Sequence, residues 1–506
     1  METIFFGSGV SKSVAKGVII LCTLAISSLI ISHTISQYIQ DDENASHMPN
    51  IILIVTDDQD MLLQGMEPMT FTKTFFETGG ITFKNGFVST PVCCPSRASM
   101  LTGRYQHNTR VINNTLRGNC CGSDWRHGAE RRTVAAHLRR RGYHTFYAGK
   151  YLNQYGLPSA GGVQHVPPGW DWWVGLVGNS RYYNYTLSVN GTARRHGDSY
   201  ADDYFTDVIV SARPGAERRL WRSWKNGGLR QAHAALFPTA AAPRTASFNV
   251  RPQDKHQLLA ELPAPLPPPL LAELDDVFRN RWRTLVSVDE MVSALVQELR
   301  RLRLLDNTHL LFTSDHGFHL GQFSLTVDKR QPYEFDLRVP LYVRGPRLPA
   351  GRTVLAPVSM VDLAPTVLEL AGLKPEPDMD GVSLLQTLAA DRRSALLVSY
   401  SGEYDKAVAP ACAFRGRNVS HCYERFACKC LDSRDNTYRC IREMTADADR
   451  VVCFFPDEEF WEVYDLTADP NQLVNLASAM SAAEKARWRR RLSAAVRCRG
   501  AACRHI

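Results

Sequence analysis

Short apolar runs, rich in β-branched residues, recur along the chain, and we interpret three of them as buried strands. They are Pro49–Val55, Thr145–Ala148 and His309–Phe312. Each run ends in polar or charged residues. In open α/β sheets, ligands bind beyond the carboxyl ends of the strands. The pattern therefore predicts one crevice, lined by the residues that follow these three runs.

A helical pattern lies between the second and third runs. Apolar side chains recur there at steps of three and four, and so form one face of a helix: Val288, Val292, Leu295, Leu299 and Leu302. Ser287 and Glu290 have the spacing of a capping box, so we expect the helix to begin there. This face is typical of core packing and indicates no chemistry.

The alternation of strands and helices predicts an α/β fold, with a mixed, mostly parallel sheet between helices over residues 48–380. A Pro-Glu-Pro sequence at Pro375–Pro377 indicates a boundary nearby. The remainder, 381–506, holds eight of the 13 cysteines and is predicted to form a smaller α+β subdomain.

The N-terminus has the residue order of a secretory leader. Lys12 and Lys16 precede an apolar run over 18–35, and acidic residues follow it. This order predicts a cleaved signal peptide or an uncleaved signal anchor, with a short stem, over 1–47. The run is close to the shortest that spans a bilayer, so both alternatives stay open.

Other features fit a secreted or luminal protein. An even cluster of cysteines behind a leader predicts disulfides. Five glycosylation sequons are present, at Asn44, Asn113, Asn184, Asn190 and Asn418, and we expect glycans on the last four. The net charge of +8 suits an acidic ligand. Nucleic acid is disfavoured because no aromatic-basic stripe accompanies the scattered arginines.

Carboxylates follow two of the predicted strands. Asp57 and Asp58 come after the first, and Asp315 after the third. Three carboxylates in one crevice repel each other unless a cation lies among them, and oxygen ligands favour calcium or magnesium. Taken alone, an Asp-Asp pair after a strand is more often a turn or a helix cap.

The most specific motif is CCPSRASMLTGR at residues 93–104. It matches C-x-P-S-R-x-x-x-L-T-G-R at every fixed position, and the chain thereby resembles the sulfatase family. The resemblance implies that Cys93 is oxidised to formylglycine by the formylglycine-generating enzyme, and that Cys94 is variable. A hydrated aldehyde offers one hydroxyl to attack sulfur and a second to expel sulfate later. The alternative, a structural Cys93–Cys94 pair, requires strained geometry.

The resemblance also implies the other site residues. A single Ca²⁺ would be bound by five side chains: Asp57, Asp58, Cys93, Asp315 and His316. Arg97, Lys150 and Lys329 would bind the sulfate oxygens and the charge that develops on the ester oxygen. His319 either contacts sulfate or protonates the leaving oxygen; a purely structural role for this histidine is an equal alternative.

Within the family the resemblance is closest to the N-acetylglucosamine-6-sulfatases. It implies an alkaline-phosphatase-like architecture and removal of 6-O-sulfate from glucosamine units of heparan or keratan sulfate. The chain lacks the long basic insertion of the extracellular endosulfatases, which favours the lysosomal type over the Golgi or the cell surface. Between Ser211 and Ala235 the family's buried strand and Ala-Pro-His-x-Pro element are missing. An inactive glycan-binding homologue and a phosphohydrolase therefore stay as alternatives.

Overall fold

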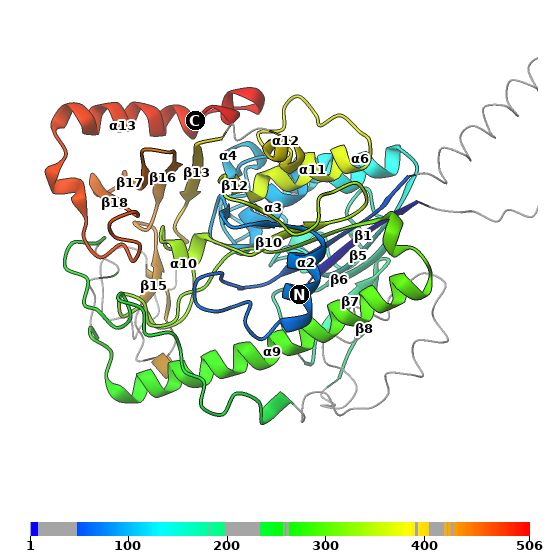
Figure 1. Ribbon diagram of the computed structural model, residues 1–506, viewed down its shortest axis with the longest axis horizontal. Helices are drawn as coiled ribbons and strands as arrows, with labels where there is room; N and C mark the ends of the chain where they lie inside the picture. The colour runs from blue at the N-terminus through cyan, green and yellow to red at the C-terminus, as the bar shows by residue number, and fades with distance from the viewer. Residues whose placement is uncertain are drawn as a thin grey trace, which may run out of the picture.

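The computed structural model describes residues 2–8, 48–181, 183–197, 233–256, 259, 263–389, 393–403, 419–422, 424–426 and 430–506. Figure 1 shows a large sheet between helices, with a smaller strand-containing part beside it. The α/β fold with a smaller subdomain is therefore confirmed.

The large sheet has ten strands, in the order β11-β3-β10-β9-β2-β1-β5-β6-β7-β8. Their bounds are β1 Glu2–Ser8, β2 Asn50–Thr56, β3 Ile81–Phe83, β5 Tyr143–Lys150, β6 Trp172–Leu176, β7 Thr186–Val189, β8 Thr192–Arg195, β9 Thr308–Ser314, β10 Leu341–Arg344 and β11 Arg352–Val354. The three runs interpreted as strands are β2, β5 and β9. All seven residues of β2 are buried, as its uninterrupted apolar pattern predicts.

Fewer strands run parallel than the sequence led us to expect. The parallel pairs are β2–β9, β5–β6 and β3–β11. The other neighbours in the large sheet are antiparallel, because β1 lies antiparallel between β2 and β5 and the β6–β7–β8 segment folds as hairpins. The mixed sheet is confirmed, but its predicted mostly parallel character is wrong for the described strands.

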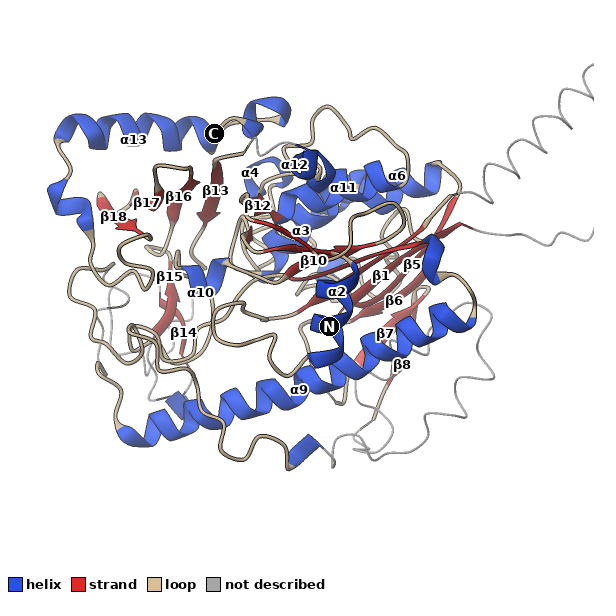
Figure 2. Cartoon of the chain, in the orientation of Figure 1, coloured by secondary structure: helices blue, strands red, loops and turns tan. Residues whose placement is uncertain are grey.

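Helices cover both faces of this sheet (Figure 2). On one face α2 (Thr70–Gly79) and α9 (Pro268–Arg301) pack on Ile52 and Ile54 of β2. On the other face lie α3 (Cys93–Thr102), α6 (Val134–Arg140) and α11 (Leu363–Leu370), which pack on the alternate side chains of β2 and β9. Shorter helices are α4 Gln106–Thr109, α5 Ser123–His127, α10 Glu334–Leu337 and α12 Leu384–Ala389.

The helix predicted near Ser287 is much longer than its pattern suggested. It is α9, which begins at Pro268, a residue type that suits the first turn because it lacks an N–H to satisfy. The predicted capping box is wrong, since Ser287 and Glu290 lie inside the helix. Both instead contact His233, whose ring nitrogens are 3.1 Å from the Ser287 Oγ and 3.1 Å from the Glu290 Oε1.

The C-terminal part is a four-stranded antiparallel sheet covered by one helix. The sheet consists of β13 Ala395–Tyr400, β16 Tyr438–Met444, β17 Asp449–Phe455 and β18 Phe460–Asp465, and the helix is α13 Ala482–Ala495. Two disulfides lie here, Cys440–Cys453 and Cys498–Cys503. A third, Cys94–Cys120, lies in the large domain. The prediction of disulfides is confirmed.

Two sequence predictions fall largely outside the described residues. The apolar run over 18–35 is one, and most of the atypical 211–235 segment is the other. Among the residues that the structure describes, no helix is both long enough and apolar enough to cross a membrane. The leader over 1–47 and the domain limits stay predictions.

Candidate active site

The carboxyl ends of β2 and β9 lie side by side because these strands are parallel neighbours in register. Asp57 and Asp58 follow β2, and Asp315 and His316 follow β9. The backbone N–H of Asp58 donates to Asp315 Oδ1 over 3.1 Å, which ties the two turns together. The predicted convergence of carboxylates at this edge is therefore present.

Cys93 is the first residue of α3 and lies against this edge with 2% of its surface exposed. Its Sγ is 3.2 Å from His316 Nε2 and 3.9 Å from Asp57 Oδ1. The start of α3 is fixed by Ser96, whose hydroxyl donates to the Asp315 carbonyl over 2.5 Å. Cys94 is bonded to Cys120, so the alternative of a Cys93–Cys94 pair is wrong and Cys93 is a free thiol.

Arg97, one turn further along α3, connects the parts of the site. Its Nε donates to Asp315 Oδ2 over 2.8 Å and its Nη1 to the Lys150 carbonyl over 2.8 Å. Its Nη2 is 3.6 Å from Asp57 Oδ1. The guanidinium is 3% exposed. One buried cation thus sets the relative positions of β2, β5 and β9.

The two lysines predicted for the site each lie on a carboxylate. Lys150 Nζ, at the end of β5, is 2.7 Å from Asp57 Oδ2, and Lys329 Nζ is 2.8 Å from Asp58 Oδ1. Burial works against the charged ammonium, but Asp58 and Cys93 raise the pKa of Lys329 well above its usual value. Both lysines are therefore cations facing the space in front of Cys93.

The cluster fits a divalent cation. The ligand atoms of Asp57, Cys93, Asp315 and His316 all lie within 4.8 Å of one another, and Asp58 adds a third carboxylate next to them. His316 Nδ1 donates to the Gly317 carbonyl over 2.9 Å, which leaves Nε2 as the ligand atom. Carboxylate oxygens are the donors that calcium and magnesium prefer.

The electrostatics of this cluster are those of a site made for positive charge. Burial opposes a charged imidazole, yet Asp315 and Cys93 raise the pKa of His316 to about 9. Burial would also raise the pKa of Asp57, but Lys150 and Lys329 hold it well below the usual value. The carboxylates are thus ionised and draw protons or other cations toward them.

His319 lies in the same loop, but a carboxylate holds its ring. Its Nδ1 is 3.1 and 3.0 Å from the two carboxylate oxygens of Asp336, and the residue is 1% exposed. Its Nε2 has no hydrogen-bond partner among the described residues. Both roles weighed for His319 fit this geometry, so its contact with substrate stays a prediction.

Sequence reasoning missed Arg281, which lies on α9 and supports the Asp57–Asp58 turn. Its Nη2 donates to the Asp58 carbonyl over 2.7 Å and to Asp60 Oδ1 over 2.8 Å. Its guanidinium also stacks on Phe318, 4.4 Å from the ring centre. Asp58 has φ of 62°, a left-handed conformation that needs such support. Nothing in the spacing of α9 distinguishes Arg281 from its neighbouring arginines.

We expect Arg281→Ala to weaken divalent-ion affinity by roughly 10-fold or more, as loss of outer-shell partners does in metal sites. The physical reason is that the Asp58 turn loses the donor to its carbonyl. Calorimetric titration with Ca²⁺ measures the effect. Arg283→Ala is the matched control, because Arg283 lies two residues further along α9 and contacts only Leu236 and Asn280. Equal ion affinity in Arg281→Ala and wild type would contradict this role.

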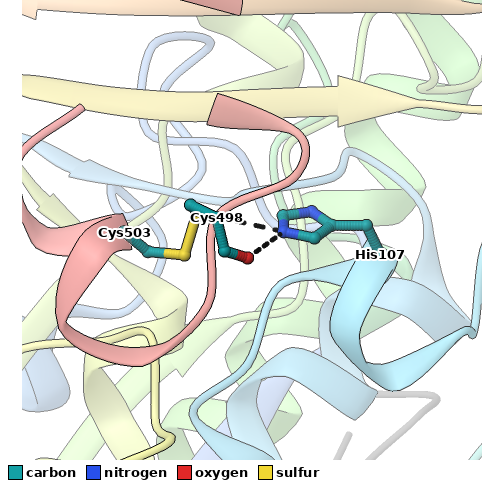
Figure 3. Close-up of side chains that lie close together, drawn as sticks. All are labelled: His107, Cys498 and Cys503. Atoms are coloured by element: carbon teal, nitrogen blue, oxygen red, sulfur yellow. Dashed lines mark hydrogen bonds between the residues drawn. A yellow bond between two sulfur atoms is a disulfide. The ribbon is translucent and has the colours of Figure 1, made fainter. Parts of the chain in front are cut away.

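A second cluster of potential metal ligands is structural. His107, Cys498 and Cys503 lie together where the C-terminal residues meet α4 (Figure 3). The two cysteines form a disulfide, so neither offers a thiolate. The His107 Nε2 donates to the Cys498 carbonyl over 3.0 Å. The contact fastens the end of the chain to the large domain.

The predicted glycosylation sites differ in exposure. Asn184 and Asn190 are exposed, at either end of β7. Asn113 is 8% exposed, and its Oδ1 accepts hydrogen bonds from Thr115. Asn418 lies outside the described residues. The four glycans stay predictions.

Comparisons with known proteins agree with this geometry. The profile of the sulfatase family matches residues 49–373. The chain is 43% identical to human N-acetylglucosamine-6-sulfatase over 482 residues, which cover 90% of this chain and 86% of that protein. It is 39% identical to a putative extracellular sulfatase Sulf-1 homolog of Caenorhabditis elegans, over 68% of this chain and 50% of the relative.

Solved structures share the fold. One, a complex with its substrate D-glucosamine-2-N,6-O-disulfate, has a TM-score of 0.63 at 22% identity and covers 89% of this chain and 97% of its own. The phosphonate monoester hydrolase of Silicibacter pomeroyi has a TM-score of 0.60 at 16% identity, covering 87% and 94%. The fold alone therefore does not separate sulfate from phosphorus chemistry. The family profile does, and with the relatives it shows that the chain belongs to the sulfatase family.

Proposed function

We propose that the protein removes 6-O-sulfate from N-acetylglucosamine or glucosamine units of heparan or keratan sulfate. The observation that carries the proposal is the position of Cys93. Its thiol lies between the Asp57 and His316 side chains, in front of two buried lysines. The similarity to N-acetylglucosamine-6-sulfatases from human, goat and cow supports the choice of sugar.

Each charged residue has a role that follows from its contacts. Bound Ca²⁺ would polarise the sulfate and lower the pKa of the nucleophilic hydroxyl. Asp57, Asp58, Asp315 and His316 would bind that ion. Lys150 and Lys329 now pair with Asp57 and Asp58, and with the ion in place they can turn to the sulfate oxygens. Arg97 keeps the carboxylates in position.

The nucleophile requires a modification of Cys93. We propose that the formylglycine-generating enzyme oxidises its side chain in the endoplasmic reticulum, giving an aldehyde that hydrates. One hydroxyl of the hydrate attacks sulfur as the sugar oxygen leaves with a proton. The second hydroxyl then loses its proton, re-forms the carbonyl and expels sulfate. Mass spectrometry of the peptide that contains Cys93 tests this step, since it must show loss of the thiol sulfur.

We propose the lysosome as the site of action. The N-terminal leader, the sequons and the disulfides fit passage through the secretory pathway. An anchored form in the Golgi or at the cell surface is the alternative, which N-terminal sequencing of the mature protein would identify by an intact residue 1–47 segment.

The proposed activity predicts a strict requirement for a divalent ion. Removing it with EDTA is expected to abolish release of sulfate from N-acetylglucosamine 6-sulfate, because the buried carboxylates then repel the substrate. Added Ca²⁺ should restore the rate, and Mg²⁺ is the comparison. Sulfate is measured by ion chromatography.

Two outcomes would contradict the proposed activity. Hydrolysis of glucosamine 6-phosphate in preference to the 6-sulfate would make the protein a phosphohydrolase. Binding of heparin without any hydrolysis, by protein whose Cys93 is fully converted to formylglycine, would make it an inactive glycan-binding homologue.

A further inference from the structure

A cavity of about 400 Å³ opens in front of the site. Its floor contains Asp57, Asp58, Lys150 and Lys329. One wall is α9, through Arg281 and its neighbours, and the opposite wall is the short segment 179–181 that follows β6. A sugar that presents its sulfate to the floor would therefore lie between α9 and this segment.

The cations that line the cavity differ in their partners. Lys150 pairs with Asp57, Lys329 with Asp58, and Arg281 with Asp60. Arg181 also lines the cavity, is exposed, and has no acidic partner among the described residues. It is thus a positive charge at the substrate entrance that the protein itself does not neutralise.

The backbone next to Arg181 is fastened to the floor of the site. The hydroxyl of Ser180 donates to Asp57 Oδ2 over 2.6 Å. Because adjacent Cα atoms are about 3.8 Å apart, Arg181 begins within one residue of the site and its long side chain extends over the distance of a sugar ring. Guanidinium groups bind sulfate and carboxylate oxygens through two parallel hydrogen bonds.

We infer that Arg181 is a specificity-determining residue that binds a second anionic group of the substrate, in addition to the sulfate that is removed. The inference rests on the proposed function. A second anion of this kind is an N-sulfate on the same sugar or the carboxylate of a neighbouring uronic acid. A substrate with only the 6-sulfate leaves Arg181 without a partner and gains nothing from it.

The test compares Arg181→Gln with wild type on three substrates. They are N-acetylglucosamine 6-sulfate, glucosamine 2-N,6-O-disulfate, and a disaccharide of a uronic acid and N-acetylglucosamine 6-sulfate. We expect kcat/KM to fall by about 10-fold or more on at least one substrate with a second anion, since a charge-assisted pair is lost. The substrate with one sulfate should change by less than about 2-fold. The affected substrate identifies the second anion.

Two controls separate charge from position. Arg181→Lys should recover part of the loss, because it keeps the charge without the paired hydrogen bonds. Arg194→Gln removes the same charge from β8, outside the cavity lining, and should leave all three rates unchanged. An equal loss on all three substrates, or no loss on any, would overturn the inference. If wild-type protein hydrolyses none of them, the proposed function fails instead.

Discussion

Replacing Cys93 by alanine is expected to lower kcat for sulfate release by roughly 10⁴-fold or more, as removal of a covalent nucleophile does in other enzymes. The variant keeps the rest of the site, so substrate binding should persist. Stability should change little, because alanine fills most of the space of a small buried thiol at the start of α3. Sulfate release from N-acetylglucosamine 6-sulfate measures the effect.

Cys121→Ala is the matched control for this prediction. Cys121 is the other free and buried cysteine among the described residues. Burial raises the pKa of its thiol well above the ordinary value, so it carries no thiolate at neutral pH. The control should keep wild-type activity. A fully active Cys93→Ala protein would end the proposed mechanism.

The second large effect is expected from Asp315→Asn, on both activity and stability. The Asp315 carboxylate is fully buried and accepts hydrogen bonds from the Arg97 side chain and the Asp58 backbone. Its loss leaves the buried guanidinium of Arg97 short of a counter-charge, which should lower the free energy of unfolding by roughly 3–5 kcal/mol. Urea unfolding followed by tryptophan fluorescence measures this, and sulfate release should become undetectable.

An exposed ion pair provides the comparison for Asp315. Asp124 lies 3.5 Å from Arg110, and both side chains are more than half exposed. Asp124→Asn should change the free energy of unfolding by less than about 1 kcal/mol, since water and salt screen such pairs. Equal losses in the two variants would show that Asp315 is not the centre of a buried charge network.

Much of the site could be predicted from sequence because its residues lie close to strand ends and within one motif. The apolar run of β2 predicted where Asp57 and Asp58 would be, and the run of β9 did the same for Asp315 and His316. The signature at 93–104 identified Cys93 and Arg97. Parallel strands place their ends at one edge of a sheet, so these local patterns were sufficient.

Arg281 and Arg181 could not be predicted in the same way. Arg281 comes from a long helix whose periodic apolar face reports only which side is buried. Arg181 comes from a loop whose position depends on the hydrogen bond between Ser180 and Asp57. The start of α9 was also misjudged, because a helix can continue through a sequence that resembles a cap when tertiary packing supports it.

By itself, the sequence determined the α/β class, the identity of the nucleophile and the carboxylates that surround it, because periodicity and short motifs are local properties of the chain. Only the tertiary structure decided which cation pairs with which carboxylate and which side chains line the cavity. It also decided that Arg181 remains unpaired among the described residues. Those properties depend on distances between residues more than 100 positions apart, such as Asp58 and Arg281, which no local pattern encodes.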